Sequence, residues 1–211
     1  MIKDNASCFM FLLIHTFVLY TFLLMYTVYP KKRYLHTIKF LKTVLPTPAT
    51  ILDLGVRNPF SEIMEGHGYE VYNTQGQDLD LVPEIVREYQ VDAVSAFEIF
   101  EHLIAPFNIL REIQAPKLIT TIPLKLWFAT AYRSKTDMWD RHYHEFEDWQ
   151  FDWLLEKSGW NIKNTEKWTN PVKKIGVRPI LRSFPPRYYA VYAERTTSNK
   201  ISKYDELTSI F

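Results

Sequence analysis

Two short segments decide the fold of this chain: Phe97-Glu98-Ile99-Phe100-Glu101-His102-Leu103 and, upstream of it, Ile51-Leu52-Asp53-Leu54-Gly55. The upstream segment is typical of a buried strand that ends at a glycine, where the backbone can approach a ligand closely. Interpreted as the start of a helix, the downstream segment places Glu98, Glu101 and His102 on one face, because residues three and four apart are neighbours there. Two carboxylates and an imidazole on one face could bind a divalent metal or transfer protons.

Strand and helix patterns alternate around these two segments. Apolar runs predict strands at residues 50–54, 69–74, 91–97 and 117–122, with two more at 160–168 and 188–194. Amphipathic or capped patterns predict helices at 34–45, 61–64, 81–89, 99–113 (interrupted or restarted at Pro106) and 147–157, with Ser61 as a cap. The alternation indicates an α/β domain with a doubly wound, mainly parallel sheet that helices cover on both faces.

Composition bounds the class of protein. The 211 residues are 47% apolar and 16% aromatic, which is enough for one core and favours a single domain. A net charge of +1 gives no overall field that would attract nucleic acid, and we find no recognised RNA-binding module, so a nucleic-acid partner is disfavoured. The only cysteine, Cys8, excludes an intrachain disulfide and a cysteine-based zinc cluster.

The first 29 residues form a separate hydrophobic segment. Residues 8–29 are a run of 22 residues without a formal charge, long enough to cross a bilayer. The basic flank Lys31-Lys32-Arg33 would then hold the following domain in the cytoplasm. Translation from Met25 is the alternative, and it also leaves a cytoplasmic domain. We therefore divide the chain into the segment 1–29, a domain at 30–195 and a tail at 196–211.

At the two quoted segments, and at residues 118–123 and 142–160, the chain resembles class I S-adenosylmethionine-dependent methyltransferases. The resemblance covers roughly residues 34–168. It implies a Rossmann-like methyltransferase fold with a final antiparallel strand and S-adenosylmethionine as cofactor. The implied reaction is methyl transfer to a small or lipid-like acceptor, which we expect at oxygen and less readily at nitrogen.

The resemblance also implies where the cofactor binds. The Gly55 turn would accommodate its methionine end, and residues 96–98 would lie near the sulfur. Gln75 falls where the family's ribose-binding acid normally lies, and Asp78 or Asp80 is the alternative. The cofactor-binding candidates are Asp53, Leu54, Gly55, Gln75, Asp78, Ala96, Phe97 and Glu98. The single glycine of the first loop and the missing ribose acid also motivate a rival hypothesis, a non-catalytic protein that keeps the fold.

Some family members, among them ubiquinone-pathway O-methyltransferases, hold a divalent metal with Glu-x-x-Glu-His and a later histidine. By that likeness Glu98, Glu101, His102 and His144 are candidate ligands for Mg²⁺ or Mn²⁺, and the metal would activate the acceptor hydroxyl. In a metal-free alternative, His142 or His144 is the general base. The candidates for catalysis are Glu101, His102, His142 and His144.

Aromatic residues gather in the expected loop at 127–143. They are Trp127, Phe128, Tyr132, Trp139 and Tyr143. Ligand pockets are often lined by aromatic side chains, so an apolar acceptor pocket is one interpretation. Ordinary packing of a loop or lid is the other.

Overall fold

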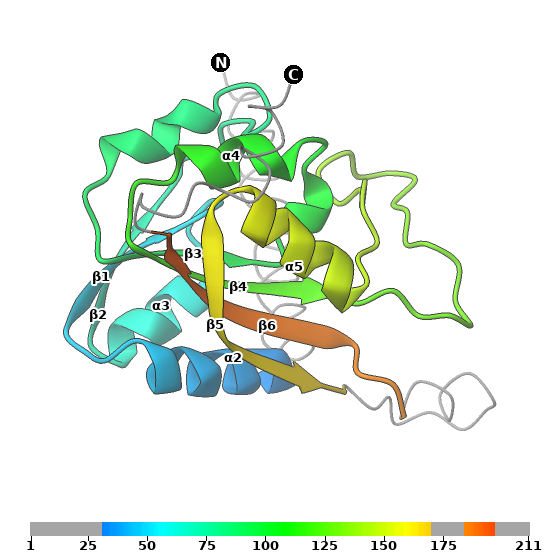
Figure 1. The fold of residues 1–211 in the computed structure, drawn as a ribbon, viewed down its shortest axis with the longest axis horizontal. Helices are drawn as coiled ribbons and strands as arrows, with labels where there is room; N and C mark the ends of the chain where they lie inside the picture. Colours follow the sequence, from blue (N-terminus) through cyan, green and yellow to red (C-terminus); the bar gives the residue numbers. More distant parts are fainter. Residues whose placement is uncertain (1–30, 170–183, 197–211) are drawn as a thin grey trace, which may run out of the picture.

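A six-stranded sheet organises residues 31–169 and 184–196, the parts of the chain that this computed structural model describes (Figure 1). The apolar segment at 8–29 and most of the tail at 196–211 lie outside the described residues. Within the described residues, no helix combines the length and the apolar character needed to cross a bilayer.

The strand order is β2-β1-β3-β4-β6-β5. The strands are β1 (Ala49–Asp53), β2 (Tyr69–Asn73), β3 (Ala93–Phe97), β4 (Lys117–Pro123), β5 (Trp160–Trp168) and β6 (Tyr188–Arg195). Neighbours from β2 to β4 pair in parallel, and β6 runs antiparallel to both β4 and β5. The predicted fold class, a doubly wound and mainly parallel sheet with a final antiparallel strand, is confirmed.

Helices cover both faces of the sheet. They are α2 (Lys31–Val44), α3 (Pro59–Gly66), α4 (Pro106–Glu112) and α5 (Asp148–Lys157). Figure 1 shows α2 and α3 on one face and α4 and α5 on the other. Each face has its own buried cluster: Phe40 and Met64 lie in the α2–α3 cluster, and Leu110 and Phe151 lie in the α4–α5 cluster. The apolar strand patterns follow from this, because a sheet covered on both faces buries successive side chains.

Two helix predictions need correction. The cap of α3 is Asn58, whose side chain accepts a hydrogen bond from the Phe60 amide, and Ser61 instead supplies the returning bond of the capping box. The helix expected at 99–113 begins instead as a short 3-10 turn at Phe100–His102, whereas the expected restart at Pro106 is confirmed, because α4 begins there. Leu103 is extended, and a proline disfavours helical geometry at the residue before it, here Ala105.

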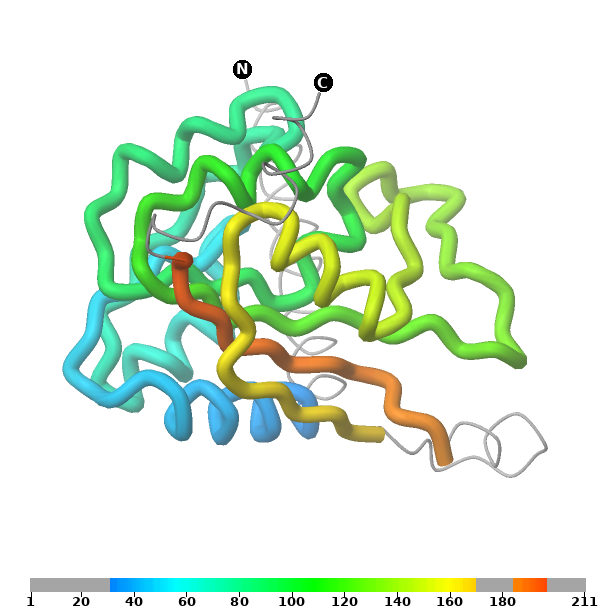
Figure 2. The backbone as a smooth tube through the Cα atoms, in the orientation of Figure 1, coloured from blue at the N-terminus to red at the C-terminus, as the bar shows by residue number. Residues whose placement is uncertain are grey.

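The chain order places a switch point between β1 and β3. From β1 the chain continues to β2 on one side, and it later returns to form β3 on the other. The connections therefore diverge at the carboxyl ends of β1 and β3, which is where open α/β sheets bind ligands. Figure 2 shows the long connection after β4, residues 124–146, projecting beyond this edge of the sheet.

Candidate functional site at the carboxyl edge of the sheet

Asp53 and Gly55 form one wall of the site at the end of β1. The Asp53 carboxylate is buried and accepts a hydrogen bond from the Ser95 hydroxyl at 2.6 Å. Burial raises the pKa of Asp53 to about 6. Gly55 has a φ of +100°, and a Cβ there would lie 3.4 Å from Cδ1 of Ile99. The turn after β1 therefore depends on glycine for its backbone conformation more than for space.

The end of β2 is hydrogen-bonded to this turn. The Gly55 amide donates to the Thr74 hydroxyl at 2.7 Å, and the Asn73 side-chain amide donates to the Asp53 carbonyl oxygen at 3.3 Å. Beside them lies an open cavity of about 410 Å³, with Gln75 and Tyr89 in its lining. Neither Asn73 nor Thr74 was among the sequence candidates. Only their place at the end of the second strand could have indicated them.

The two aspartates after β2, Asp78 and Asp80, accept hydrogen bonds from backbone amides. Asp80 accepts hydrogen bonds from the amides of Ile104 and Ala105, each at 2.8 Å, with different carboxylate oxygens. This ties the loop after β2 to the turn before α4. The Asp78 carboxylate accepts a hydrogen bond from the Asp80 amide at 3.0 Å. Both carboxylate oxygens of Asp80 are therefore occupied by backbone hydrogen bonds, whereas Gln75 borders the cavity.

Glu98 lies at the same edge of the sheet, immediately after β3. Its φ is +59°, so it is not the start of a helix, and the expectation that Glu98, Glu101 and His102 share one helical face is wrong. The Arg33 guanidinium of α2 lies 3.4 Å from Oε2 of Glu98. Burial raises the pKa of Glu98, and the charge of Arg33 opposes that shift.

Glu101 is the most deeply buried acid of the site. It is 1% exposed, and neither of its carboxylate oxygens has a hydrogen-bond partner among the described residues. Burial, and then the nearby charge of Glu98, raise the pKa of Glu101 well above its usual range. Its backbone carbonyl accepts hydrogen bonds from the amides of Tyr143 at 2.8 Å and His144 at 3.2 Å, which brings the 124–146 connection over the site.

The histidines divide into two groups. One potential ligand atom from each of Glu101, His102 and His142 lies within 4.8 Å of the other two. His144 points elsewhere, since its Nε2 lies 3.1 Å from the Ile104 carbonyl oxygen and its ring stacks on Phe146. The structure thus groups His142, rather than His144, with Glu101 and His102. Burial and the neighbouring His102 lower the pKa of His142 to about 4, so this imidazole is neutral at pH 7.

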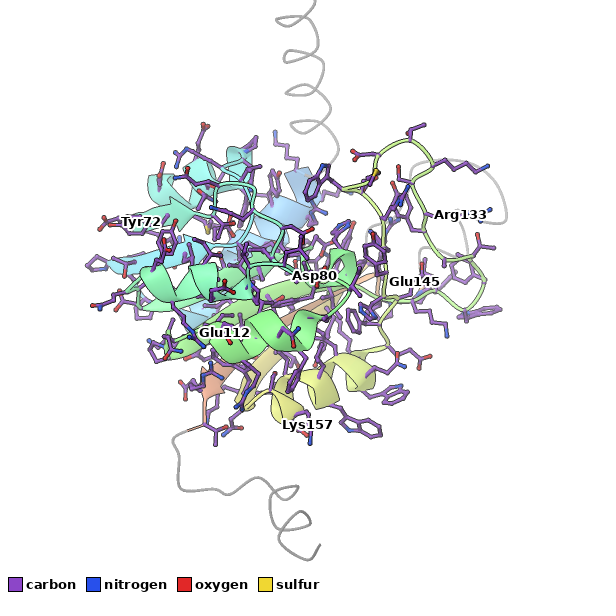
Figure 3. All side chains as sticks on the ribbon, turned by 90° about the horizontal axis from the view of Figure 1, so that it is seen from above. Tyr72, Asp80, Glu112, Arg133, Glu145 and Lys157 are labelled. Carbon is purple, nitrogen blue, oxygen red and sulfur yellow. The ribbon has the colours of Figure 1, made fainter. Side chains whose placement is uncertain are left out.

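The predicted aromatic acceptor pocket does not form as expected. Trp127 and Trp139 are 79% and 74% exposed, because they lie on the outside of the 124–146 connection. Tyr132 does lie near the site, with its ring centroid 4.6 Å from that of His142. Figure 3 shows this part of the molecule, marked by Arg133 and Glu145, on the side opposite Tyr72.

The architecture defines a class: a Rossmann-like α/β domain with a switch point between β1 and β3. No family model and no curated protein matches the chain. Its fold is that of S-adenosylmethionine-dependent methyltransferases, as solved structures show at low sequence identity. An enzyme from Archaeoglobus fulgidus is 16% identical, with a TM-score of 0.56 over 81% of this chain and 99% of that one.

Two further solved structures share this fold. The 1,6-didemethyltoxoflavin N1-methyltransferase of Burkholderia thailandensis, solved with its substrate and S-adenosylhomocysteine, is 15% identical. The match covers 84% of this chain and 89% of that one, with a TM-score of 0.53. Phosphoethanolamine N-methyltransferase 2 of Haemonchus contortus, solved with S-adenosylmethionine, is 13% identical. That match covers 77% of this chain and 52% of the other, with a TM-score of 0.52.

Proposed function

We propose that this protein is an S-adenosylmethionine-dependent methyltransferase acting on a small or lipid-like acceptor, preferentially at oxygen. The observation that carries the proposal is the switch point between β1 and β3, where the left-handed Gly55 turn follows β1 and Glu98, also at a positive φ, follows β3. Open α/β sheets bind ligands at this position, and the likeness to solved methyltransferases supports the choice of cofactor.

The residues at the switch point fit this cofactor. Asp53, Leu54 and Gly55 would border its methionine end, and Ala96, Phe97 and Glu98 would face its sulfur. At the end of β2, Gln75 adjoins the cavity of about 410 Å³, where a neutral amide could bond ribose hydroxyls, with Asp78 as the alternative. When bound, the cofactor supplies an electrophilic methyl group, and the chain has to align the acceptor with it.

Glu101 and His142 are our candidates for handling the acceptor proton. A carboxyl whose pKa is raised by burial is a better base, once ionised, than one in water, so Glu101 is suited to receive a proton. His142 is neutral at pH 7 and can accept a hydrogen bond from the acceptor hydroxyl. His102 lies beside both and would orient them. His144 is less suited, because its Nε2 is engaged by Ile104.

Calorimetric titration with S-adenosylhomocysteine tests the cofactor assignment. We expect saturable binding that Gly55→Ala weakens by about tenfold or more, because alanine disfavours the left-handed φ by about 1–2 kcal/mol. Gly66→Ala is the matched control, since a Cβ at Gly66 meets nothing within 4 Å. Absence of binding by folded wild-type protein would refute the enzyme assignment and favour a non-catalytic role for the fold.

A divalent metal is a second proposal, favoured by the cluster of Glu101, His102 and His142 within 4.8 Å. A carboxylate with two imidazoles is a donor set that Mn²⁺ accepts, and the Glu101 oxygens have no other partner among the described residues. The metal would supply Lewis acidity that lowers the pKa of the acceptor hydroxyl. Glu98 would lie outside this set, because its Oε2 faces Arg33.

The metal proposal is tested by direct binding. We expect Mn²⁺ to bind the wild-type chain in calorimetry, and Glu101→Gln to weaken that binding at least tenfold. Glu147→Gln is the matched control, because Glu147 is exposed at the start of α5 and outside the cluster. Chelation by EDTA should abolish activity if the metal takes part. Equal Mn²⁺ binding by wild type and Glu101→Gln would exclude this site.

A further inference from the structure

Four of the six tryptophans of this chain are exposed. Trp127, Trp139, Trp149 and Trp153 have exposed fractions of 79%, 74%, 44% and 63%. The other two, Trp160 and Trp168, are buried in the core. Met138 and Phe184 are also exposed, by 69% and 78%. Exposed apolar groups scattered singly need no explanation, but a set of large aromatic side chains on adjacent segments does.

These side chains come from three segments whose backbones are joined beyond β4. The Leu124 amide donates to the Arg187 carbonyl oxygen at 2.7 Å, next to the stretch that carries Phe184. The Lys125 amide donates to the Phe146 carbonyl oxygen at 2.8 Å, next to the start of α5. Figures 1 and 3 show α5 beside the 124–146 connection. We call the set Trp127, Met138, Trp139, Trp149, Trp153 and Phe184 the aromatic edge.

The aromatic edge lies at the same end of the sheet as the proposed active site. The connection that carries Trp127 and Trp139 is hydrogen-bonded to the backbone of Glu101. The first turn of α2 reaches this end as well, since Arg33 pairs with Glu98. In the sequence, the 22 uncharged residues 8–29 end directly before this turn. A domain tethered there would have its carboxyl edge near the attachment point.

Charges of both signs surround the aromatic edge. The acids of the connection accept hydrogen bonds within it, Glu145 from the Tyr132 amide and Asp137 from the Trp139 amide at 2.9 Å, and they keep their negative charge, as do the acids of α5. Arg133, Lys135 and Arg141 form no ion pair with any residue in the described ranges. These cations remain available to an anionic surface.

We propose that the aromatic edge docks on the surface of a phospholipid bilayer containing anionic headgroups. Tryptophan is enriched at membrane interfaces because its ring is apolar and its N–H is polar, and basic side chains beside it add attraction to anionic lipid. This proposal rests on the proposed function and narrows its acceptor to an amphipathic molecule that the proposed active site meets at the membrane. A protein partner would also cover aromatic side chains, and the test separates the two.

The native tryptophans are the probes for this test. All six lie in the described domain, and residues 8–29 contain none, so tryptophan emission reports the domain even when the apolar segment enters the bilayer. The full chain is reconstituted with vesicles of phosphatidylcholine and phosphatidylserine, with or without bromine in the acyl chains, and bound protein is collected by flotation. We expect brominated lipid to quench the emission of bound protein.

Variants show which tryptophans are quenched by the brominated lipid. The double variant Trp127→Ser and Trp139→Ser should lose about half of it, because Trp149 and Trp153 then carry the rest of the contact. Trp160→Phe is the control, because Trp160 is buried at the amino-terminal end of β5, away from the aromatic edge. This variant should be quenched like the wild type.

Three outcomes would overturn the proposal: chain that does not float with vesicles, equal emission with brominated and plain lipid, or a double variant quenched like wild type. If the wild type self-associates, the double variant does not, and brominated lipid quenches neither, the aromatic edge binds a second copy of the chain instead. S-adenosylhomocysteine binding is measured separately. A chain that binds this ligand without quenching refutes the docking surface alone, whereas quenching without ligand binding refutes the methyltransferase assignment.

Discussion

Replacing Asp53 by asparagine should remove a pH-dependent cost of folding. Asp53 is 2% exposed at the end of β1, and its partners, the Ser95 hydroxyl at 2.6 Å and the Asn73 amide at 3.3 Å, are uncharged. Burial without a cation disfavours the ionised carboxylate, and its pKa rises from 3.8 to about 6. Asparagine keeps the shape of the side chain and an oxygen that can accept from Ser95, but it does not titrate.

The size and sign of the effect follow from this shift. A difference of about two pKa units between the unfolded and folded states corresponds to about 3 kcal/mol, at about 1.4 kcal/mol per unit. Between pH 3.8 and 6 the folded state holds the proton more tightly than the unfolded state. The stability of the wild type therefore falls, relative to Asp53→Asn, as pH rises through this window.

Urea unfolding followed by circular dichroism, at half-unit steps from pH 3.5 to 7.5, measures the difference between the two proteins. Asp92→Asn is a control of opposite sign. Its pKa is lowered, chiefly by the hydrogen bond from the Thr50 backbone amide, so its contribution to stability is lost as pH falls. A wild-type minus Asp53→Asn difference that stays constant from pH 4 to 7 would refute the argument from burial.

Two further predictions concern stability. Arg33→Met should cost about 2 kcal/mol at pH 8, because the buried Glu98 then loses its cation. The cost should be smaller at pH 4, because the raised pKa of Glu98 favours its neutral form as pH falls, and urea unfolding at both pH values measures this. An equal cost at the two pH values would show that the ion pair is not the cause. Trp160→Phe should cost about 1–3 kcal/mol by leaving the buried Leu110 carbonyl oxygen without its indole donor, and an unchanged urea midpoint would contradict this.

The sheet could be predicted from the sequence because its strands are either buried runs or bounded by clear breaks. Residues 160–168 were predicted as a strand and form β5 with the same bounds. The prediction that a helix starts directly after β3 was wrong, because sequence periodicity carries no information on a single backbone angle. Glu98 takes a left-handed φ, so the polypeptide turns before any helix starts. The 3-10 turn and the extended Leu103 occupy the residues that were assigned to the part of the helix before Pro106.

The site was predictable where it depends on one segment and not where it depends on packing between segments. Asp53 is the last residue of β1 and Gly55 follows it, so their place at the carboxyl edge was foreseeable. Arg33 was missed because its partner is 65 residues away. The choice between His142 and His144 depends on how the 124–146 connection is hydrogen-bonded to Glu101, and no sequence period encodes that.

The two buried acids Glu98 and Glu101 make ligand binding at the switch point sensitive to the charge of the ligand. Burial raises the pKa of both Glu98 and Glu101, although the charge of Arg33 opposes the shift at both and that of Arg187 opposes it at Glu98. At neutral pH the pair therefore retains a proton more readily than two carboxyls in water. A cation bound nearby would displace that proton, whereas a neutral ligand of the same shape would not.

S-adenosylmethionine carries a sulfonium charge and S-adenosylhomocysteine does not, so the two ligands should differ in the protons they release. Calorimetry in two buffers of different ionisation enthalpy measures that release. We expect more protons from the sulfonium ligand, and the difference should shrink in Glu101→Gln, which removes the titrating carboxyl. Equal release by both ligands would mean that the sulfur binds away from Glu98 and Glu101, and the roles proposed for these acids would have to be reassigned.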